Sequence, residues 1–189
     1  ITSGLVGSEM CIRDRALCIG PLETELAPDE LVVSASLHYP GSLPRSDLTK
    51  DSAADELTAG WGFREVARRA GDYALAGAAA WLSRGTGGSV REARIAVFGL
   101  AQTPLRLRGC EALLEGQLLT LIGDRDTPAE GVEAEAELDA SFVEALNEAI
   151  SPESDLHASE AYRRHLASVV VARALAPAWR RSIDGDGCK

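Results

Sequence analysis

The sequence contains only four cysteines among its 189 residues, and their spacing matches neither a disulfide framework nor a metal site. They are Cys11, Cys18, Cys110 and Cys188. Closely spaced cysteine pairs are the usual signature of structural disulfides and of zinc ligands. We therefore expect no metal bound to this chain, and a protein of the reducing cytoplasm.

Long apolar stretches are also missing. No run approaches the roughly 18 apolar residues that a membrane-spanning helix requires. Hydrophobic residues nevertheless make up 46% of the chain, which is enough for a buried core. We expect a soluble protein without a membrane span. The sequence also has no P-loop, no nucleophile elbow and no zinc-ligand spacing, so none of these motifs identifies a reaction.

An excess of basic residues is absent as well, because the formal net charge is −10. Nucleic-acid-binding proteins usually carry a basic face, so we predict no nucleic-acid partner. Residues 61–108 carry eight arginines against three acids, whereas residues 109–160 carry fourteen acids against Arg125 alone. The basic segment could face an anionic cofactor or an acidic partner, although a solvated, charge-balanced surface is the commoner explanation.

Apolar runs predict strands in the first half of the chain. A partly alternating run at 31–38 is typical of a strand. Residues 40–60 are rich in Pro, Ser, Asp and Gly, which predicts a loop. Two further apolar runs, 74–83 and 93–100, flank the glycine cluster Gly85–Gly88. They predict an antiparallel hairpin with the glycines as its turn.

Helical periodicity follows. One helix is expected after Pro104, one after Pro128 that ends at Ser151, and one from about Ala158 that closes near Leu175. Their apolar stripes are Cys110, Leu113, Leu114 and Leu118 in the first, Leu138, Phe142, Leu146 and Ile150 in the second, and Tyr162, Leu166, Val169 and Val170 in the third. Strands followed by helices predict an α+β fold, with a small antiparallel sheet of about three strands covered by three helices.

Two segments of the chain have a distinctive composition. Gly60–Leu75 reads Gly-Trp-Gly-Phe-Arg-Glu-Val-Ala-Arg-Arg-Ala-Gly-Asp-Tyr-Ala-Leu, and Asp155–Leu166 reads Asp-Leu-His-Ala-Ser-Glu-Ala-Tyr-Arg-Arg-His-Leu. With Gly20–Thr24 and Arg94–Arg106, and in this order, they resemble the C-terminal domain of the flavoprotein (medium) subunit of molybdenum hydroxylases. Carbon monoxide dehydrogenase and xanthine dehydrogenase belong to that family. The resemblance spans most of residues 20–176 and implies the same α+β architecture.

The resemblance implies a role in a multi-subunit oxidoreductase. Substrate would be oxidised at a molybdenum cofactor on a large partner subunit. Electrons would cross [2Fe–2S] clusters on a small iron–sulfur subunit to FAD, which would pass them to an acceptor. This chain would complete the FAD pocket and position the cofactor, which carries the chemistry.

The resemblance also divides the chain. Residues 1–15 resemble a translated sequencing adapter, so we set them aside as a non-biological leader. Residues 16–28 would be the remnant of the exit from the FAD-binding domain, 29–180 the C-terminal domain, and 181–189 a tail. The two glycine-rich FAD loops of the family have no counterpart before Gly20. We therefore expect a fragment that is inactive alone.

Asp72 and Tyr73 are the best candidates for a site. In the family that the chain resembles, the matching segment approaches the isoalloxazine ring. There an aromatic side chain would shield the flavin and a carboxylate would influence the charge balance at its nitrogens. Arg68 and Arg69 would stabilise anionic reduced flavin or a flavin phosphate. The residues alone also allow a structural reading, in which Asp72 forms a turn with Gly71 and Tyr73 packs at a strand start.

Asp155, His157 and Ser159 could suggest a metal site or a hydrolytic pair. Their spacing opens a helix, however, and Asp or Ser at that position most simply caps it. His38 and His165 have no neighbouring carboxylate or cysteine constellation in the sequence, so we expect them to be structural.

The segment Tyr162-Arg163-Arg164 is expected to combine helix packing with surface charge, or to contact a partner subunit. An alternative to the enzyme is a non-enzymatic α+β interaction module that shares the fold. Its docking faces would be the acidic helix at 130–150 and the basic segment at 61–108.

Overall fold

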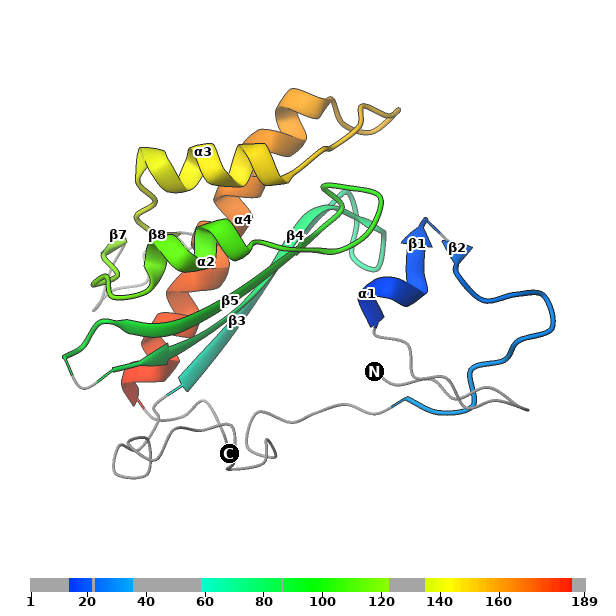
Figure 1. The fold of residues 1–189 in the computed structure, drawn as a ribbon. Helices are drawn as coiled ribbons and strands as arrows, with labels where there is room; N and C mark the ends of the chain where they lie inside the picture. The colour runs from blue at the N-terminus through cyan, green and yellow to red at the C-terminus, as the bar shows by residue number, and fades with distance from the viewer. Residues whose placement is uncertain (1–13, 22, 36–58, 86, 123–134, 185–189) are drawn as a thin grey trace. The chain divides into compact units, whose positions relative to one another are not determined.

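The computed structural model describes residues 14–21, 23–35, 59–85, 87–122 and 135–184, which form two separate units (Figure 1). The first unit, Ile1–Glu56, contains the helix α1 (Asp14–Leu17) and the antiparallel pair β1 (Cys18–Gly20) and β2 (Glu23–Thr24). Residues 31–35 form no strand, so the strand predicted at 31–38 is wrong in its described part. Leu31 and Val33 stay 66% and 59% exposed there, without the burial that stabilises such a run as a strand.

The second unit, Leu57–Lys189, is built on a four-stranded antiparallel sheet in the order β3-β4-β5-β6. Its strands are β3 (Ala59–Ala67), β4 (Ala74–Arg84), β5 (Val90–Phe98) and β6 (Leu105–Arg106). A short pair, β7 (Leu121–Ile122) with β8 (Glu135–Ala136), lies beside the helices α2 (Arg108–Leu114), α3 (Ala140–Ala149) and α4 (Glu160–Asp184). The predicted α+β class is confirmed.

The predicted hairpin is also confirmed, with β4 and β5 as its arms. Ala80 pairs with Ile95 and Leu82 with Ala93, and all four side chains are buried on the same face. At the turn, Gly88 has a φ of +79°, a conformation that favours glycine, and its N–H donates to the Gly85 carbonyl at 2.9 Å.

The strand β3 was not predicted, because two of its inward-facing positions are glycines and not the apolar residues that are typical of a strand. Glycines at positions 60 and 62 are normally unfavourable inside a strand. Here they face α4 so closely that a Cβ on Gly60 would lie 2.0 Å from the Ala178 carbonyl oxygen. A Cβ on Gly62 would lie 1.9 Å from the Ala174 carbonyl oxygen. The glycines therefore let the backbone of a helix pack directly on a strand.

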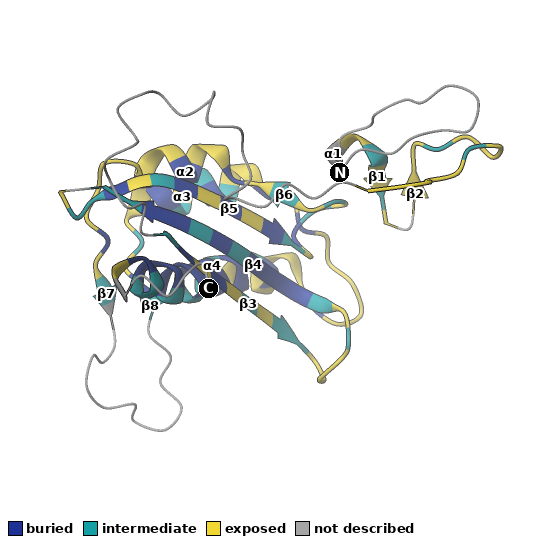
Figure 2. Cartoon of the chain, turned by 90° about the horizontal axis from the view of Figure 1, so that it is seen from below, coloured by how far each residue is buried: buried dark blue, intermediate teal, exposed yellow. Residues whose placement is uncertain are grey.

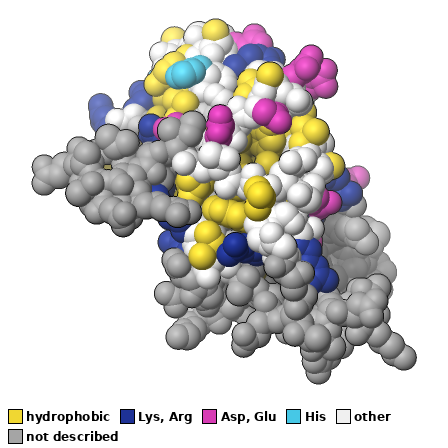
Figure 3. All heavy atoms as spheres, turned by 90° about the vertical axis from the view of Figure 1, so that its left-hand side faces the viewer, with side chains coloured by type: hydrophobic (Ala, Val, Ile, Leu, Met, Phe, Trp, Pro, Cys, Tyr) yellow, Lys and Arg dark blue, Asp and Glu magenta, His cyan; other side chains and the backbone are white. Residues whose placement is uncertain are grey.

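The helix α2 is shorter than predicted and starts later. Pro104 precedes the strand β6, and the helix begins at Arg108. Cys110 and Leu114 are buried as expected, but Leu113 is 40% exposed within the helix. Leu118 is 71% exposed, because the helix has ended before it. Figure 3 views this end of the domain, where hydrophobic side chains reach the surface among charged ones.

The helices α3 and α4 also differ from the prediction at their ends. Asp139 caps α3 by accepting from the Phe142 N–H at 2.7 Å, so Leu138 lies before the helix, while Phe142, Leu146 and Ile150 are buried. In the described part of the acidic helix predicted at 130–150, only the ten residues Ala140–Ala149 are helical.

In α4, Leu166 and Val170 are buried, whereas Tyr162 is 47% exposed. The helix continues through Pro177 to Asp184, beyond the predicted close at Leu175 and beyond the boundary between residues 180 and 181. Small buried residues such as Ala174 and Ala178 keep this last part of the helix on the glycines of β3.

The core lies between one face of the sheet and the helices. The helix α4 lies across β3 and β4, α2 lies along β5, and α3 packs mainly on α2 and α4 rather than on the sheet. Figure 2 shows β4 buried along most of its length and β3 with alternating exposed positions. Among the described residues, no helix is both long and apolar enough to cross a membrane.

Candidate functional site

The connection from β3 to β4, residues 68–73, carries the predicted site residues and is called the Asp72 corner. Arg68 Nη2 and Asp72 Oδ2 lie 3.0 Å apart, with 44% and 27% of these side chains exposed. The Asp72 N–H donates to the Arg69 carbonyl at 3.2 Å, and Asp72 Oδ1 accepts from the Tyr73 N–H at 2.9 Å. Gly71, with a φ of +82°, supplies the left-handed residue of this turn.

The Tyr73 side chain projects from the corner and is 88% exposed. The structural alternative is therefore correct for the Asp72 turn and wrong for Tyr73, which does not pack at the start of β4. The exposed corner presents an aromatic ring, a carboxylate held by two hydrogen bonds, and the exposed Arg69. Such a set can stack on a planar ring and interact with an anionic group.

Arg163, for which helix packing with surface charge was expected, is buried close to this corner. It is 8% exposed, and its Nη1 donates to the carbonyl oxygens of Leu75 at 2.6 Å and Gly99 at 3.1 Å. Its Nη2 bonds Asp155 Oδ2 at 2.6 Å. Helical spacing could have found it, because Arg163 lies three and seven residues before the buried Leu166 and Val170.

The loop before α4 confirms the capping interpretation for Ser159, whereas Asp155 closes a turn that lies ahead of the helix and caps no helix residue. Asp155 Oδ1 accepts from the N–H groups of His157 and Ala158, both at 2.8 Å. Ser159 Oγ accepts from the Tyr162 N–H at 3.2 Å as α4 begins. Hydrogen bonds from His157 and Ala158, with the charge of Arg163, hold the pKa of Asp155 below its usual value.

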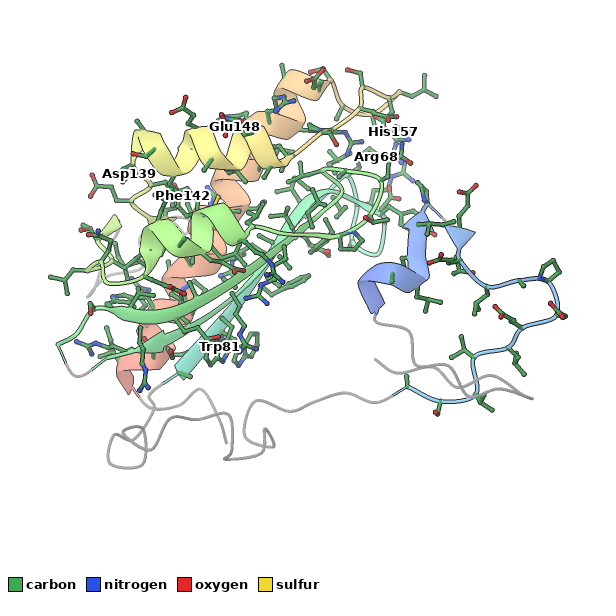
Figure 4. The ribbon with its side chains drawn as sticks, viewed as in Figure 1. Arg68, Trp81, Asp139, Phe142, Glu148 and His157 are labelled. Atoms are coloured by element: carbon green, nitrogen blue, oxygen red, sulfur yellow. The ribbon has the colours of Figure 1, made fainter. Side chains whose placement is uncertain are left out.

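The remaining polar candidates do not assemble into a site. The side chains of His157 and His165 are exposed, and His38 lies outside the described residues. Within the described ranges, no three His, Cys, Asp or Glu side chains lie close enough together to hold a metal ion. Arg164, unlike Arg163, is bonded at the surface to Glu160 at 2.9 Å. Figure 4 places Arg68 and His157 at the same end of the domain.

The outer face of the sheet forms a second exposed surface. A shallow hollow of about 570 Å³ lies over the middle strands, lined by Trp61, Phe63, Trp81, Arg94 and Arg106 among others. Trp61 and Phe63 are 51% and 45% exposed. The Arg94 guanidinium stacks over Trp81 at 5.2 Å, a cation–π contact that orders the rim of the hollow.

The basic segment at 61–108 does not form the single docking face of the alternative hypothesis. Its arginines are spread over several surfaces of the domain. Arg68 lies at the Asp72 corner, Arg94 lines the outer face of the sheet, and Arg84 stacks on a tryptophan of α4. Arg106 is held by the buried Glu111 at 2.8 Å, a hydrogen bond that raises the pKa of Arg106 above its ordinary value. Arg94 pairs with Glu92 at 2.7 Å. Much of the positive charge on the outer face is thereby compensated within the domain.

Comparison with known proteins identifies a family for most of the second unit. Residues 61–122 and 126–178 match the family described as the CO dehydrogenase flavoprotein C-terminal domain. The nicotine 6-hydroxylase medium subunit of Paenarthrobacter nicotinovorans is 31% identical over 88% of this chain and 47% of its own length. The carbon monoxide dehydrogenase medium chain of Hydrogenophaga pseudoflava is 33% identical over 65% of this chain and 37% of its own length.

A solved structure has the same fold. The reconstituted CO dehydrogenase from Oligotropha carboxidovorans matches with a TM-score of 0.69 at 24% identity, over 95% of this chain and 53% of that one. The chain thus spans about half the length of the relatives that it matches.

Proposed function

The chain belongs to the family of CO dehydrogenase flavoprotein C-terminal domains, and we propose from this that it forms one wall of the FAD pocket in a molybdenum hydroxylase. The flavoprotein role follows from the family. The relatives are named as the medium subunit of a nicotine hydroxylase and the medium chain of a CO dehydrogenase. Since the chain spans about half of their length, we place the rest of the FAD site in the other half of such a subunit.

The observation that carries the proposal is the exposed Asp72 corner. An isoalloxazine ring requires a flat apolar contact and hydrogen-bonding or charged groups near its nitrogens. The exposed ring of Tyr73 can provide the flat apolar contact, and the fixed carboxylate of Asp72 can provide the charged group near the nitrogens. Arg68 and Arg69 add positive charge to the same corner, which suits an anionic group. The residues present therefore fit the cofactor.

In this proposal the chain positions and shields the cofactor. FAD, when bound, supplies the electron transfer between [2Fe–2S] clusters and an external acceptor. Tyr73 would exclude water from one edge of the ring, and Asp72 would hold a fixed negative charge beside it. Arg68 keeps that carboxylate oriented through their 3.0 Å contact. The partners would be a large molybdenum-cofactor subunit and a small iron–sulfur subunit, in the cytoplasm.

The test is substitution of the corner in the holoenzyme. We expect Tyr73→Ala and Asp72→Asn to lower FAD content or to change the visible circular dichroism of the flavin. Tyr162→Ala, which removes a half-exposed tyrosine from α4, should change neither. A flavin whose content and spectrum are the same in all three variants would contradict the proposed site. A holoenzyme without flavin would instead favour the interaction module.

A further inference from the structure

The buried guanidinium of Arg163 has no role in the proposed function as stated so far. Its three hydrogen bonds reach the Leu75 carbonyl, the Gly99 carbonyl and the Asp155 carboxylate. These acceptors belong to the start of β4, the residue that follows β5 and the loop before α4. One side chain therefore joins three segments that are far apart in the sequence.

Two of these acceptors lie directly beside the Asp72 corner. Leu75 is the second residue after Tyr73. Gly99, with a φ of +73°, comes so near that a Cβ on it would lie 2.9 Å from the Ala74 carbonyl oxygen and 3.0 Å from that of Leu75. The backbone that leaves the corner is thus held by Gly99 and by Arg163. Tyr73 itself is too exposed to fix the corner by packing.

Stability alone gives a weak reason for a charged side chain at this position. Its ion pair with Asp155 is partly exposed, because 45% of the Asp155 side chain is accessible to solvent, and exposed ion pairs contribute little to stability. The Arg163 Nε, moreover, has no hydrogen-bond partner among the described residues, and a buried donor without a partner destabilises the folded state. The planar guanidinium offers instead a fixed geometry, because its donors set the relative directions of several acceptors at once.

We propose that Arg163 is a positioning residue that holds the Asp72 corner in the orientation in which it meets the flavin. It acts through the carbonyl oxygens of Leu75 and Gly99, and Asp155 orients its guanidinium. The proposal rests on the proposed function, since it assigns Arg163 to the same flavin site. It adds a residue that does not touch the cofactor.

The experiment compares three holoenzyme variants. Arg163→Lys keeps the charge but cannot reproduce the planar set of three bonds, and Asp155→Asn removes the charge that orients the guanidinium. Arg164→Lys is the matched control on the next residue of α4, which bonds Glu160 and the Asn147 carbonyl. Amide hydrogen exchange of residues 69–76 reports the order of the corner, and the visible circular dichroism and reoxidation rate of the flavin report its effect.

We expect faster exchange at residues 69–76, and a flavin reoxidation rate changed by about tenfold, in Arg163→Lys, because small displacements of positioning groups are costly. Asp155→Asn should give a smaller change of the same kind, and Arg164→Lys none. Unchanged exchange in both test variants overturns the proposal, and so does faster exchange with an unaltered flavin.

The Tyr73→Ala holoenzyme separates the two possible failures. If that variant alters the flavin while Arg163→Lys does not, the proposed function stands and the positioning role of Arg163 is wrong. If neither variant alters the flavin, the placement of the Asp72 corner at the cofactor is wrong as well.

Discussion

The thiol of Cys110 illustrates how burial of a single group links folding to pH. It is 1% exposed, and burial raises its pKa to about 11 from an ordinary value of 9.0. The unfolded thiol therefore loses its proton at lower pH than the folded one. Between about pH 9 and 11 the unfolded state binds fewer protons, so the free energy of unfolding falls, by about 2–3 kcal/mol over the whole window.

Urea unfolding at pH 8, 9.5 and 10.5 checks this prediction. Cys110→Ala should lose part of the alkaline decline, while Cys18→Ala, at an exposed position, should keep it. Equal declines in both variants would show that the buried thiol does not contribute.

Asp155 is predicted to make the stability of the fold depend on pH in the acid range. Its pKa is lowered by the N–H groups of His157 and Ala158 and by Arg163, so its stabilising effect is present above the unfolded pKa of about 4. The effect is lost as the pH falls through the lower folded pKa. We expect Asp155→Asn to flatten the pH dependence of stability below pH 4, measured by thermal unfolding. Glu148→Gln, at an exposed helix position, should not, and a similar flattening in both would disprove the assignment.

At the scale of residues, the sequence predicted the roles that depend on neighbours in the chain. The Asp72 turn and the Ser159 cap are local hydrogen-bond patterns, and both are confirmed. The burial of Arg163 was within reach of helical spacing, but its hydrogen-bond partners were not. Its acceptors Leu75 and Gly99 are 88 and 64 residues away, and only the tertiary fold brings them together. The exposure of Tyr73 depends on the same fold. The contact of the corner with FAD stays a prediction.

At the scale of elements, the contact of β3 with α4 depends on glycine. Gly62→Ala would place a methyl group 1.9 Å from the Ala174 carbonyl oxygen, so the helix must move away from the strand. We expect a loss of about 3 kcal/mol, the upper range for overpacking. Chemical denaturation measures it directly.

Gly109→Ala is the matched control within a helix. Nothing lies within 4 Å of a Cβ at Gly109 in α2, so this substitution should stabilise the protein by about 0.5–1 kcal/mol. If both substitutions had the same effect, the close approach of β3 and α4 would be wrong.

The elements that the sequence predicted well are those with a regular apolar pattern. The β4–β5 hairpin and the buried stripe of α3 follow directly from it. The strand β3 was not predicted because its inner positions carry glycine in place of apolar side chains. These glycines allow close packing of α4, which lies more than a hundred residues later in the sequence. The run at 31–35 had the apolar pattern of a strand but remains exposed, so pattern alone did not suffice.

At the scale of the whole molecule, the helices cover one face of the sheet and leave aromatic residues on the other. Phe63 and Phe98 stack there with ring centroids 5.7 Å apart, and Arg181 lies over Trp61 at 4.1 Å. The architecture was predicted from the order of strands and helices. The exposed aromatic face was not predicted, because Trp61 and Phe63 belong to β3, a strand that was not predicted either. Contiguous apolar surfaces of this kind usually mark a contact with another protein surface.

We therefore predict that the double substitution Trp61→Ser with Phe63→Thr reduces self-association of the purified chain. Both side chains are about half exposed, so their loss should cost only about 1–2 kcal/mol of stability, including the aromatic stacking. Sedimentation velocity over a concentration series measures the association. Leu156→Ser is the control, since Leu156 is 98% exposed but is remote from the sheet in the sequence. Equal association of all three proteins would mean that the arginines stacked over Trp61 and Trp81 already keep this face from pairing.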